Sequence, residues 1–275
     1  MKRFLVSLTF LLILVGCSNE GKKVSLRLHK AEVYYEQKNY FAAKKEIDSI
    51  RSLYPKNVDA LRGSLTLMRK VQLGESERNL AFCDSLLPIR KHDFEELKKN
   101  FVFEKDTVYE NIGHYIWKWQ TIERNLKRCY VRCGTDEKGE MYLASVFYGA
   151  KPLKHTSIKV TAPDHTFAET ATIPYDGGVN YRFTDLGATT EVVTYYGEKG
   201  VNAIKFIYDN VDKRLKINYL GGRPYIIYMA KADKEALTAT YNLAMVLSDI
   251  DRMQKEATKA SKRIAYLKGK FAEKK

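Results

Sequence analysis

Histidines with a nearby carboxylate are the residues of this sequence best suited to acid–base chemistry or metal binding. The five histidines are His29, His92, His114, His155 and His165. No two stand three or four residues apart, the spacing that metal sites on a helix prefer. His155 and His165 flank an expected strand over 157–162. If they converged at one end of the β domain, they would form a metal or acid–base site with Asp164. Solvated loop histidines are the simpler interpretation.

Other patterns that mark an enzyme are missing from the sequence. It contains no Gly-x-Ser-x-Gly turn and no glycine-rich phosphate loop. Glu95 and Glu96 are adjacent on an expected helix, so their carboxylates diverge and form a solvated face. We therefore expect no catalytic residue, no metal ligand and no cofactor, and a hydrolase that uses His155 or His165 is only a third hypothesis.

The cysteines comprise Cys17 near the start of the chain and three others. Cys129 and Cys133 are four residues apart, which places them on one face of a helix but too far apart to bridge in an extended strand. Their spacing differs from that of a two-residue zinc knuckle, and no second pair follows. Buried thiols are the expected role for these two and for Cys83, with at most one disulfide inside a monomer.

The opening of the chain predicts export. Lys2 and Arg3 precede an apolar run over 4–15, which is followed by Gly16 and Cys17. The run is too short to span a bilayer as a stable helix, and its basic start and small-residue end are typical of an export signal. An ordinary cleaved signal peptide with an incidental cysteine is the alternative.

Leu14-Val15-Gly16-Cys17 resembles the lipobox of bacterial lipoproteins. The resemblance implies cleavage before Cys17, a diacylglycerol on its thiol and an acyl chain on its new amine. Residues 1–16 would then be a signal peptide and 17–24 a lipidated tether. The residue after Cys17 is Ser18 and not Asp. By the lipoprotein sorting rule, this resembles a lipoprotein that is sent to the outer membrane. Residues 18–23 lack the acidic cluster of surface-exported lipoproteins of Bacteroidetes-type envelopes, so we expect a lipid anchor on the periplasmic face of the outer membrane.

The chain is strongly basic. Its formal net charge is +14, and removal of residues 1–16 with their two basic side chains leaves +12. Such a balance would suggest nucleic acid in a cytosolic protein, but an exported chain rarely meets it, so no nucleic-acid partner is expected. The anions within reach are lipid head groups, lipopolysaccharide phosphates and acidic glycans. A lysine-rich soluble surface is the simpler interpretation.

A helical region is expected over 25–128. Small, aromatic and apolar residues recur in its first part at Ala31, Tyr34, Tyr40, Ala43, Ile47, Ile50, Leu53 and Pro55. This pattern resembles a tetratricopeptide (TPR) repeat. The resemblance implies two helices, about 26–37 and 40–53, that approach closely at their alanines.

A second, degraded helix pair is expected after the first. It would occupy 58–73 and 75–87, separated by Gly74 and stopped by Pro88. One good repeat and one poor one make a short platform of helical hairpins, because a TPR array usually needs three or more repeats to bury its core.

Residues 91–128 are expected to continue as helix, with a break around 102–106. Trp117 and Trp119 stand two residues apart, so they would point to different faces of a helix or share one face of a strand. Core or domain-interface packing is their usual role. A sugar-stacking platform is the functional alternative, because aromatic side chains are favoured at binding sites.

An antiparallel β domain is expected over 129–230, as a sandwich or open barrel. Candidate strands with alternating apolar residues are 141–148, 157–162, 167–173, 179–184, 190–196, 202–208, 214–220 and 225–230. Turn residues separate them, and the turns at 209–210 and 221–222 predict a three-strand meander over 202–230.

One long helix of coiled-coil type is expected over 231–275. Its heptad seam consists of Ala232, Ala236, Ala239, Leu243, Val246, Ile250, Met253, Ala257, Ala260, Ile264, Leu267 and Phe271. The partner of this seam is open between the N-terminal helices, a second copy and another protein.

Three short motifs, Asp48-Ser49-Ile50, Asp84-Ser85-Leu86 and Asp106-Thr107-Val108, resemble the O-glycosylation acceptor of Bacteroidetes-type periplasmic proteins. The resemblance implies glycans on Ser49, Ser85 and Thr107. Over most of its length the chain resembles uncharacterised lipoproteins of such envelopes, and that resemblance carries no activity with it.

The expected class is therefore α+β, and the leading hypothesis is a non-enzymatic outer-membrane lipoprotein. It would contact envelope proteins through its helical region or its C-terminal helix, as a scaffold. The second hypothesis is a module that binds a glycan or peptidoglycan fragment through aromatic residues of the β domain. Aromatic side chains exposed together on one β face would support it.

Overall fold

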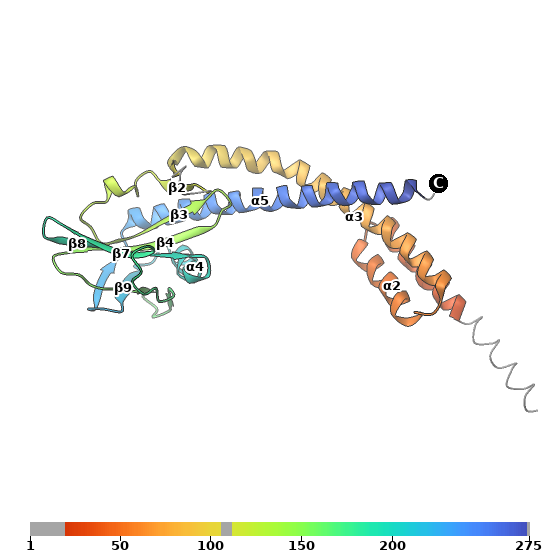
Figure 1. Ribbon diagram of the computed structural model, residues 1–275, viewed down its shortest axis with the longest axis horizontal. Helices are drawn as coiled ribbons and strands as arrows, with labels where there is room; N and C mark the ends of the chain where they lie inside the picture. The colour runs from red at the N-terminus through yellow and green to blue at the C-terminus, as the bar shows by residue number, and fades with distance from the viewer. Residues whose placement is uncertain (1–19, 106–111, 274–275) are drawn as a thin grey trace, which may run out of the picture. The chain divides into compact units, whose positions relative to one another are not determined.

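The computed structural model describes residues 20–105 and 112–273. The predicted α+β class is confirmed (Figure 1). The chain divides into two compact units. We call them the helical unit, which comprises described residues 20–86 and 254–273, and the β unit, which comprises 87–105 and 112–253. Cys17, residues 1–16 and Thr107 lie outside the described residues.

The helical unit begins with the predicted TPR-like hairpin. Residues 20–36 are helical, and α2 (Tyr40–Leu53) follows with the Asn39 side chain accepting a hydrogen bond from the Ala42 N–H group at its start. Ala31 and Ala43 are fully buried, which lets the two helices approach closely. The same core includes Ile47 and Val71, the latter from α3.

The prediction of a second helix pair is wrong, because α3 (Val58–Leu97) is one helix of 40 residues. Gly74 does not interrupt it. A Cβ at this position would lie 2.9 Å from the hydroxyl oxygen of Tyr40, so the glycine makes room for a ring of the first hairpin. Pro88 also lies inside the helix, at the cost of one backbone hydrogen bond.

The β unit contains two antiparallel sheets among its described residues. Their orders are β1-β2-β3-β4-β8-β7 and β10-β9-β5-β6. The strands are β1 Phe101–Glu104, β2 His114–Trp117, β3 Tyr130–Asp136, β4 Met141–Gly149, β5 Ser157–Thr161, β6 Phe167–Glu169, β7 Asn180–Asp185, β8 Ala188–Tyr196, β9 Lys216–Leu220 and β10 Tyr225–Tyr228. Leu143 of the first sheet and Ile217 of the second share one core, so a sandwich-like packing of two sheets is present.

Three segments of the β unit differ from expectation. Strand β3 is one of them, because no candidate strand covers it. The helix predicted over 91–128 ends at Leu97, and β1 and β2 follow it. Their aromatic side chains pack on one another as strand neighbours, with the rings of Phe101 and Trp117 5.3 Å apart. The predicted strand 202–208 is instead helix α4 (Val201–Asp209). Its buried residues Ala203, Ile204 and Ile207 share one helix face, so the predicted meander reduces to the β9–β10 hairpin.

The long C-terminal helix is confirmed as α5 (Lys231–Ala272). Its seam is largely covered by the chain itself, apart from the exposed Ala232. In the β unit, Leu243 and Leu247 pack with Phe101. In the helical unit, Leu267 is buried and Lys268 forms an ion pair with Glu77 of α3. Within the described residues, no helix is both long enough and apolar enough to cross a membrane.

Candidate functional site: a pocket on the outer face of the six-stranded sheet

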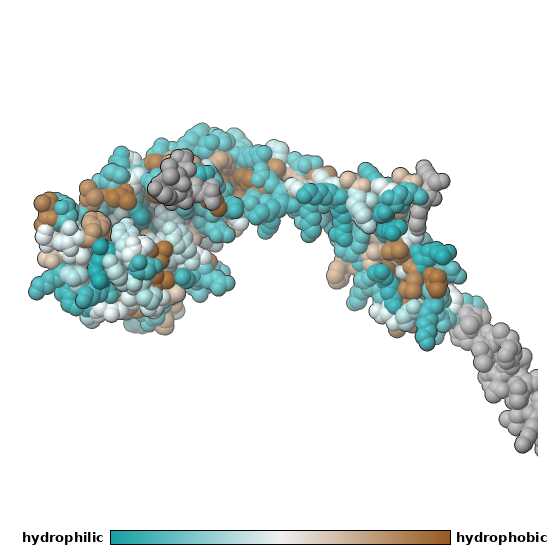
Figure 2. All heavy atoms as spheres, in the orientation of Figure 1, coloured by the Kyte–Doolittle hydropathy of each residue, from teal (hydrophilic) through white to brown (hydrophobic). Residues whose placement is uncertain are grey.

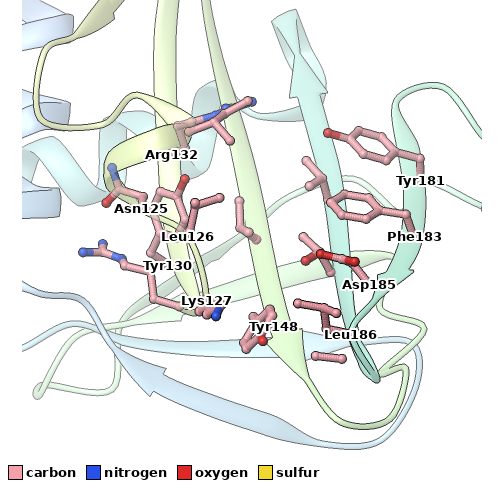
Figure 3. A pocket seen from close by; sticks show the side chains of 16 residues that line it. Asn125, Leu126, Lys127, Tyr130, Arg132, Tyr148, Tyr181, Phe183, Asp185 and Leu186 are labelled. Atoms are coloured by element: carbon pink, nitrogen blue, oxygen red, sulfur yellow. The ribbon is translucent and has the colours of Figure 1, made fainter.

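A pocket of about 370 Å³ lies on the face of the six-stranded sheet that points away from the shared core (Figure 3). We call it the outer-face pocket. Strands β3, β4, β8 and β7 form its floor, and the segment 122–128 forms a wall. The volume falls within the range of small-molecule sites.

The strand register builds the floor in rows. One row crosses four strands, because Tyr130 pairs with Val146, Val146 with Val192 and Val192 with Tyr181. Since side chains two residues apart share a sheet face, the next row contains Tyr148, Thr190 and Phe183. The floor thus carries aromatic side chains on three strands, and Phe183 is 53% exposed.

The wall and rim of the pocket are apolar and exposed. Ile122 and Leu126 of the wall are 52% and 65% exposed, and Leu186 in the β7–β8 turn is 92% exposed. Figure 2 shows hydrophobic surface at the tip of this hairpin. The side chain of Asn125 holds the wall in shape by donating to the carbonyl oxygens of Trp119 and Thr121, at 2.8 Å each.

Buried polar contacts tie the wall to the start of α5. Arg128 forms an ion pair with Asp233, and the Gln120 amide donates to the same carboxylate at 3.2 Å. Burial raises the pKa of Asp233, and these two partners oppose the rise without cancelling it. The guanidinium group of Arg128 also lies over the Tyr130 ring, at 4.4 Å from its centre.

Arg132 is the charged residue at one end of the floor. Its Nε atom is buried and has no hydrogen-bond partner among the described residues. Figure 3 shows its guanidinium group and the hydroxyl group of Tyr181 pointing toward one another across the pocket, with Asp185 nearer the other end. The pocket therefore combines an aromatic floor with a cation at one end, which suits a flat ligand with an acidic group.

The alternative in which His155 and His165 converge is not found, because the two residues lie at opposite ends of β5. His165 lies in the exposed turn that follows the strand. Asp164 accepts a hydrogen bond from Lys213 at 2.7 Å, which lowers the pKa of its carboxyl group. Within 20–105 and 112–273, no three His, Cys, Asp or Glu side chains gather as a metal site would require.

His155 instead belongs to a buried network inside the β unit. Its Nε2 lies 2.8 Å from the Ser145 hydroxyl oxygen and its Nδ1 lies 3.0 Å from the Glu191 carboxylate. The order serine, histidine, carboxylate matches that of a nucleophilic relay. However, the three residues are only 0%, 1% and 2% exposed. Ser145 also bonds the Tyr195 hydroxyl at 3.1 Å, so the network fastens the segment before β5 to the first sheet.

The other predicted site residues do not line the outer-face pocket. Trp117 packs on Phe101, and Trp119 is 61% exposed with Arg124 over its ring at 4.5 Å. Ser49 and Ser85 lie on α2 and α3, where their hydroxyl groups donate to backbone oxygens one turn back. Among the residues that the structure describes, Cys83, Cys129 and Cys133 form no disulfide.

Sequence reasoning did not identify the pocket residues individually, although one signal was present. Strand β4 has no polar face, since apolar or aromatic side chains occupy nearly every position from 141 to 148. A strand of this kind is covered on both sides. Glu191 carried a similar signal, because it interrupts the otherwise uncharged inward positions of β8.

No protein-family model, no curated protein and no solved structure matches this chain.

Proposed function

We propose that this protein is a non-enzymatic, lipid-anchored envelope protein whose β unit binds a glycan or peptidoglycan fragment in the outer-face pocket. The observation that supports this most directly is the aromatic floor. Tyr148 and Phe183 lie in the same row of the sheet, and the rings of Tyr181 and Phe183 are nearly parallel, at 13° with centres 6.5 Å apart. Flat aromatic faces are suited to stacking on the apolar faces of sugar rings.

Replacing Phe183 by Ala should weaken binding of a peptidoglycan-derived disaccharide by about 2- to 10-fold, because a lost aromatic stack is worth about 0.5–1.5 kcal/mol. Isothermal titration with the purified mature chain measures this. Phe183 is half exposed, so the fold should be retained. Phe167→Ala is the matched control, since Phe167 is 54% exposed on β6 of the other sheet. Equal affinity of both variants and the parent chain would contradict the proposal.

The anchor in this proposal is a lipid on Cys17, at the periplasmic face of the outer membrane. It is supported by the apolar run and the Leu-Val-Gly that precede this cysteine. Cells grown with radiolabelled palmitate should label the parent chain and leave Cys17→Ser unlabelled. An unlabelled parent chain that stays soluble after lysis would remove the anchor from the proposal.

A scaffold for protein contacts is the second candidate function. Phe41 and Leu53 are 78% and 57% exposed on α2, where they border an open groove with Lys44 and Lys45. The heptad seam supports this candidate less, because the chain covers most of it. If no saccharide binds in the titrations above, the scaffold takes the place of the glycan-binding proposal.

A further inference from the structure

We infer that the outer-face pocket selects ligands with an oxyanion, a carboxylate or a phosphate, and that Arg132 binds this group while a sugar ring stacks on Tyr148 and Phe183. The inference rests on the proposed function, because it specifies the class of glycan that the pocket takes. It also assigns an orientation to the ligand.

The first argument is the state of Arg132. Its side chain is half-buried and forms no hydrogen bond or ion pair with another described residue. A buried donor without an acceptor destabilises the folded chain, so native proteins rarely keep one without a reason. Arg128, the neighbouring guanidinium, is already paired with Asp233. Lys127 also lines the pocket, but its side chain is exposed, so water satisfies its ammonium group without a ligand. Arg132 is therefore the cation in this pocket whose buried N–H group a ligand would satisfy.

The second argument is the geometry of the floor. Arg132 pairs with Ala144, which lies two residues from Val146 and four from Tyr148 on β4. At a rise of about 3.3 Å per residue, the row of Arg132 is about 13 Å from the row of Tyr148 and Phe183. The long arginine side chain shortens this gap. A stacked sugar ring with an acidic substituent therefore reaches from the aromatic row to the guanidinium group.

The third argument is the polarity of the two ends. Tyr181 presents its hydroxyl group toward Arg132 (Figure 3), where it would donate to the same oxyanion. Asp185, which pairs with Ala188, lies one row beyond Phe183 at the other end of the floor. It would repel an acidic group there. Lys127 lies near Tyr148 (Figure 3), but it is exposed, so water screens its attraction for an anion. The partly buried guanidinium group of Arg132 and the repulsion from Asp185 thus favour one orientation, with the anion beside Arg132.

The test is a titration of the mature chain with three probes of matched size. They are a glucuronic-acid disaccharide, its neutral methyl ester and a disaccharide phosphate. The parent chain should bind at least one acidic probe about 10-fold more tightly than the ester. Arg132→Gln should bring that probe down to the affinity of the ester, and Arg132→Lys should keep part of the preference, since it retains charge without the planar fork.

Arg182→Gln is the matched control, because Arg182 lies on the opposite face of the same sheet, over the Tyr175 ring. It should keep the preference of the parent chain. Thermal melts establish that each variant is folded. Preference for one acidic probe identifies the carboxylate or the phosphate as the source. Equal binding of all three probes would overturn the inference and leave the proposed function standing, whereas no binding of any probe would remove both.

Discussion

Replacing Glu191 by Gln should lower the free energy of unfolding by about 3–5 kcal/mol at pH 7, because it removes one partner of a buried, hydrogen-bonded pair. Both carboxylate oxygens of Glu191 accept from the Lys154 N–H group at 2.8 Å, and one also accepts from the His155 ring at 3.0 Å. Glutamine offers a single acceptor oxygen, so its amide group would face donors that it cannot satisfy. Urea unfolding followed by circular dichroism measures the loss.

The loss should depend on pH in a defined direction. Burial raises the pKa of Glu191, but the hydrogen bonds from His155 and from the Lys154 N–H group lower it by more, and the net pKa is below the ordinary value of 4.5. A carboxyl group of this kind stabilises the fold above its unfolded-state pKa. That contribution disappears as the pH falls through the lower folded-state pKa. The difference between Glu191→Gln and the parent chain should therefore shrink below about pH 4.5.

Glu169 provides the matched control for this prediction. Its side chain is 45% exposed and forms an ion pair with Lys159 on the surface of the second sheet. Glu169→Gln should change stability by less than about 1 kcal/mol. A loss for Glu191→Gln that is as small as this, or that stays constant down to pH 3, would show that the buried network does not hold the sheet as described.

Replacing Gly139 by Ala should destabilise the β unit by about 2–4 kcal/mol, through overpacking and backbone strain together. Gly139 lies in the β3–β4 turn with φ of 84°, a conformation that side chains disfavour. A Cβ there would lie 2.3 Å from the Ala244 carbonyl oxygen and 2.5 Å from the Ser248 backbone nitrogen. Both are backbone atoms of α5, so the turn itself would have to move.

Gly177→Ala separates the two causes. Gly177 has a similar φ of 77°, but nothing lies within 4 Å of the position of its Cβ. The Gly177→Ala variant should therefore lose only the backbone contribution to the free energy of unfolding, about 1 kcal/mol. Thermal or urea unfolding of both variants measures the difference. If the two substitutions lower the free energy of unfolding by the same amount, the β3–β4 turn does not pack against α5 as closely as these distances indicate.

The predictions from sequence succeeded where a local pattern alone decides the structure. The seam of α5 repeats every seven residues, as Met253, Ala260 and Leu267 illustrate, and all three are buried. No other element type produces that period. The strand predicted from alternating apolar residues is wrong at Val201–Asp209. A segment of nine residues with three buried apolar positions fits a strand and a helix almost equally. The helix break predicted at Gly74 is wrong for a different reason, since this glycine makes room for a ring from another helix.

The candidate site was beyond the reach of a single sequence. Tyr130 and Tyr181 are 51 positions apart, and only the order of strands β3-β4-β8-β7 places them in one row. A pattern along the chain identifies strands but not their neighbours. The same holds for Ser145, His155 and Glu191, which meet through the packing of a loop on the sheet.

Asp233 connects two properties that are usually separate. It lies in the first turn of α5, where a carboxylate favours the onset of a helix, and it holds Arg128 of the pocket wall. A substitution at this position would alter ligand affinity and helix onset at once. A substitution of Asp233 that weakens ligand binding would therefore not show that Asp233 contacts the ligand, because the same substitution also changes the start of α5.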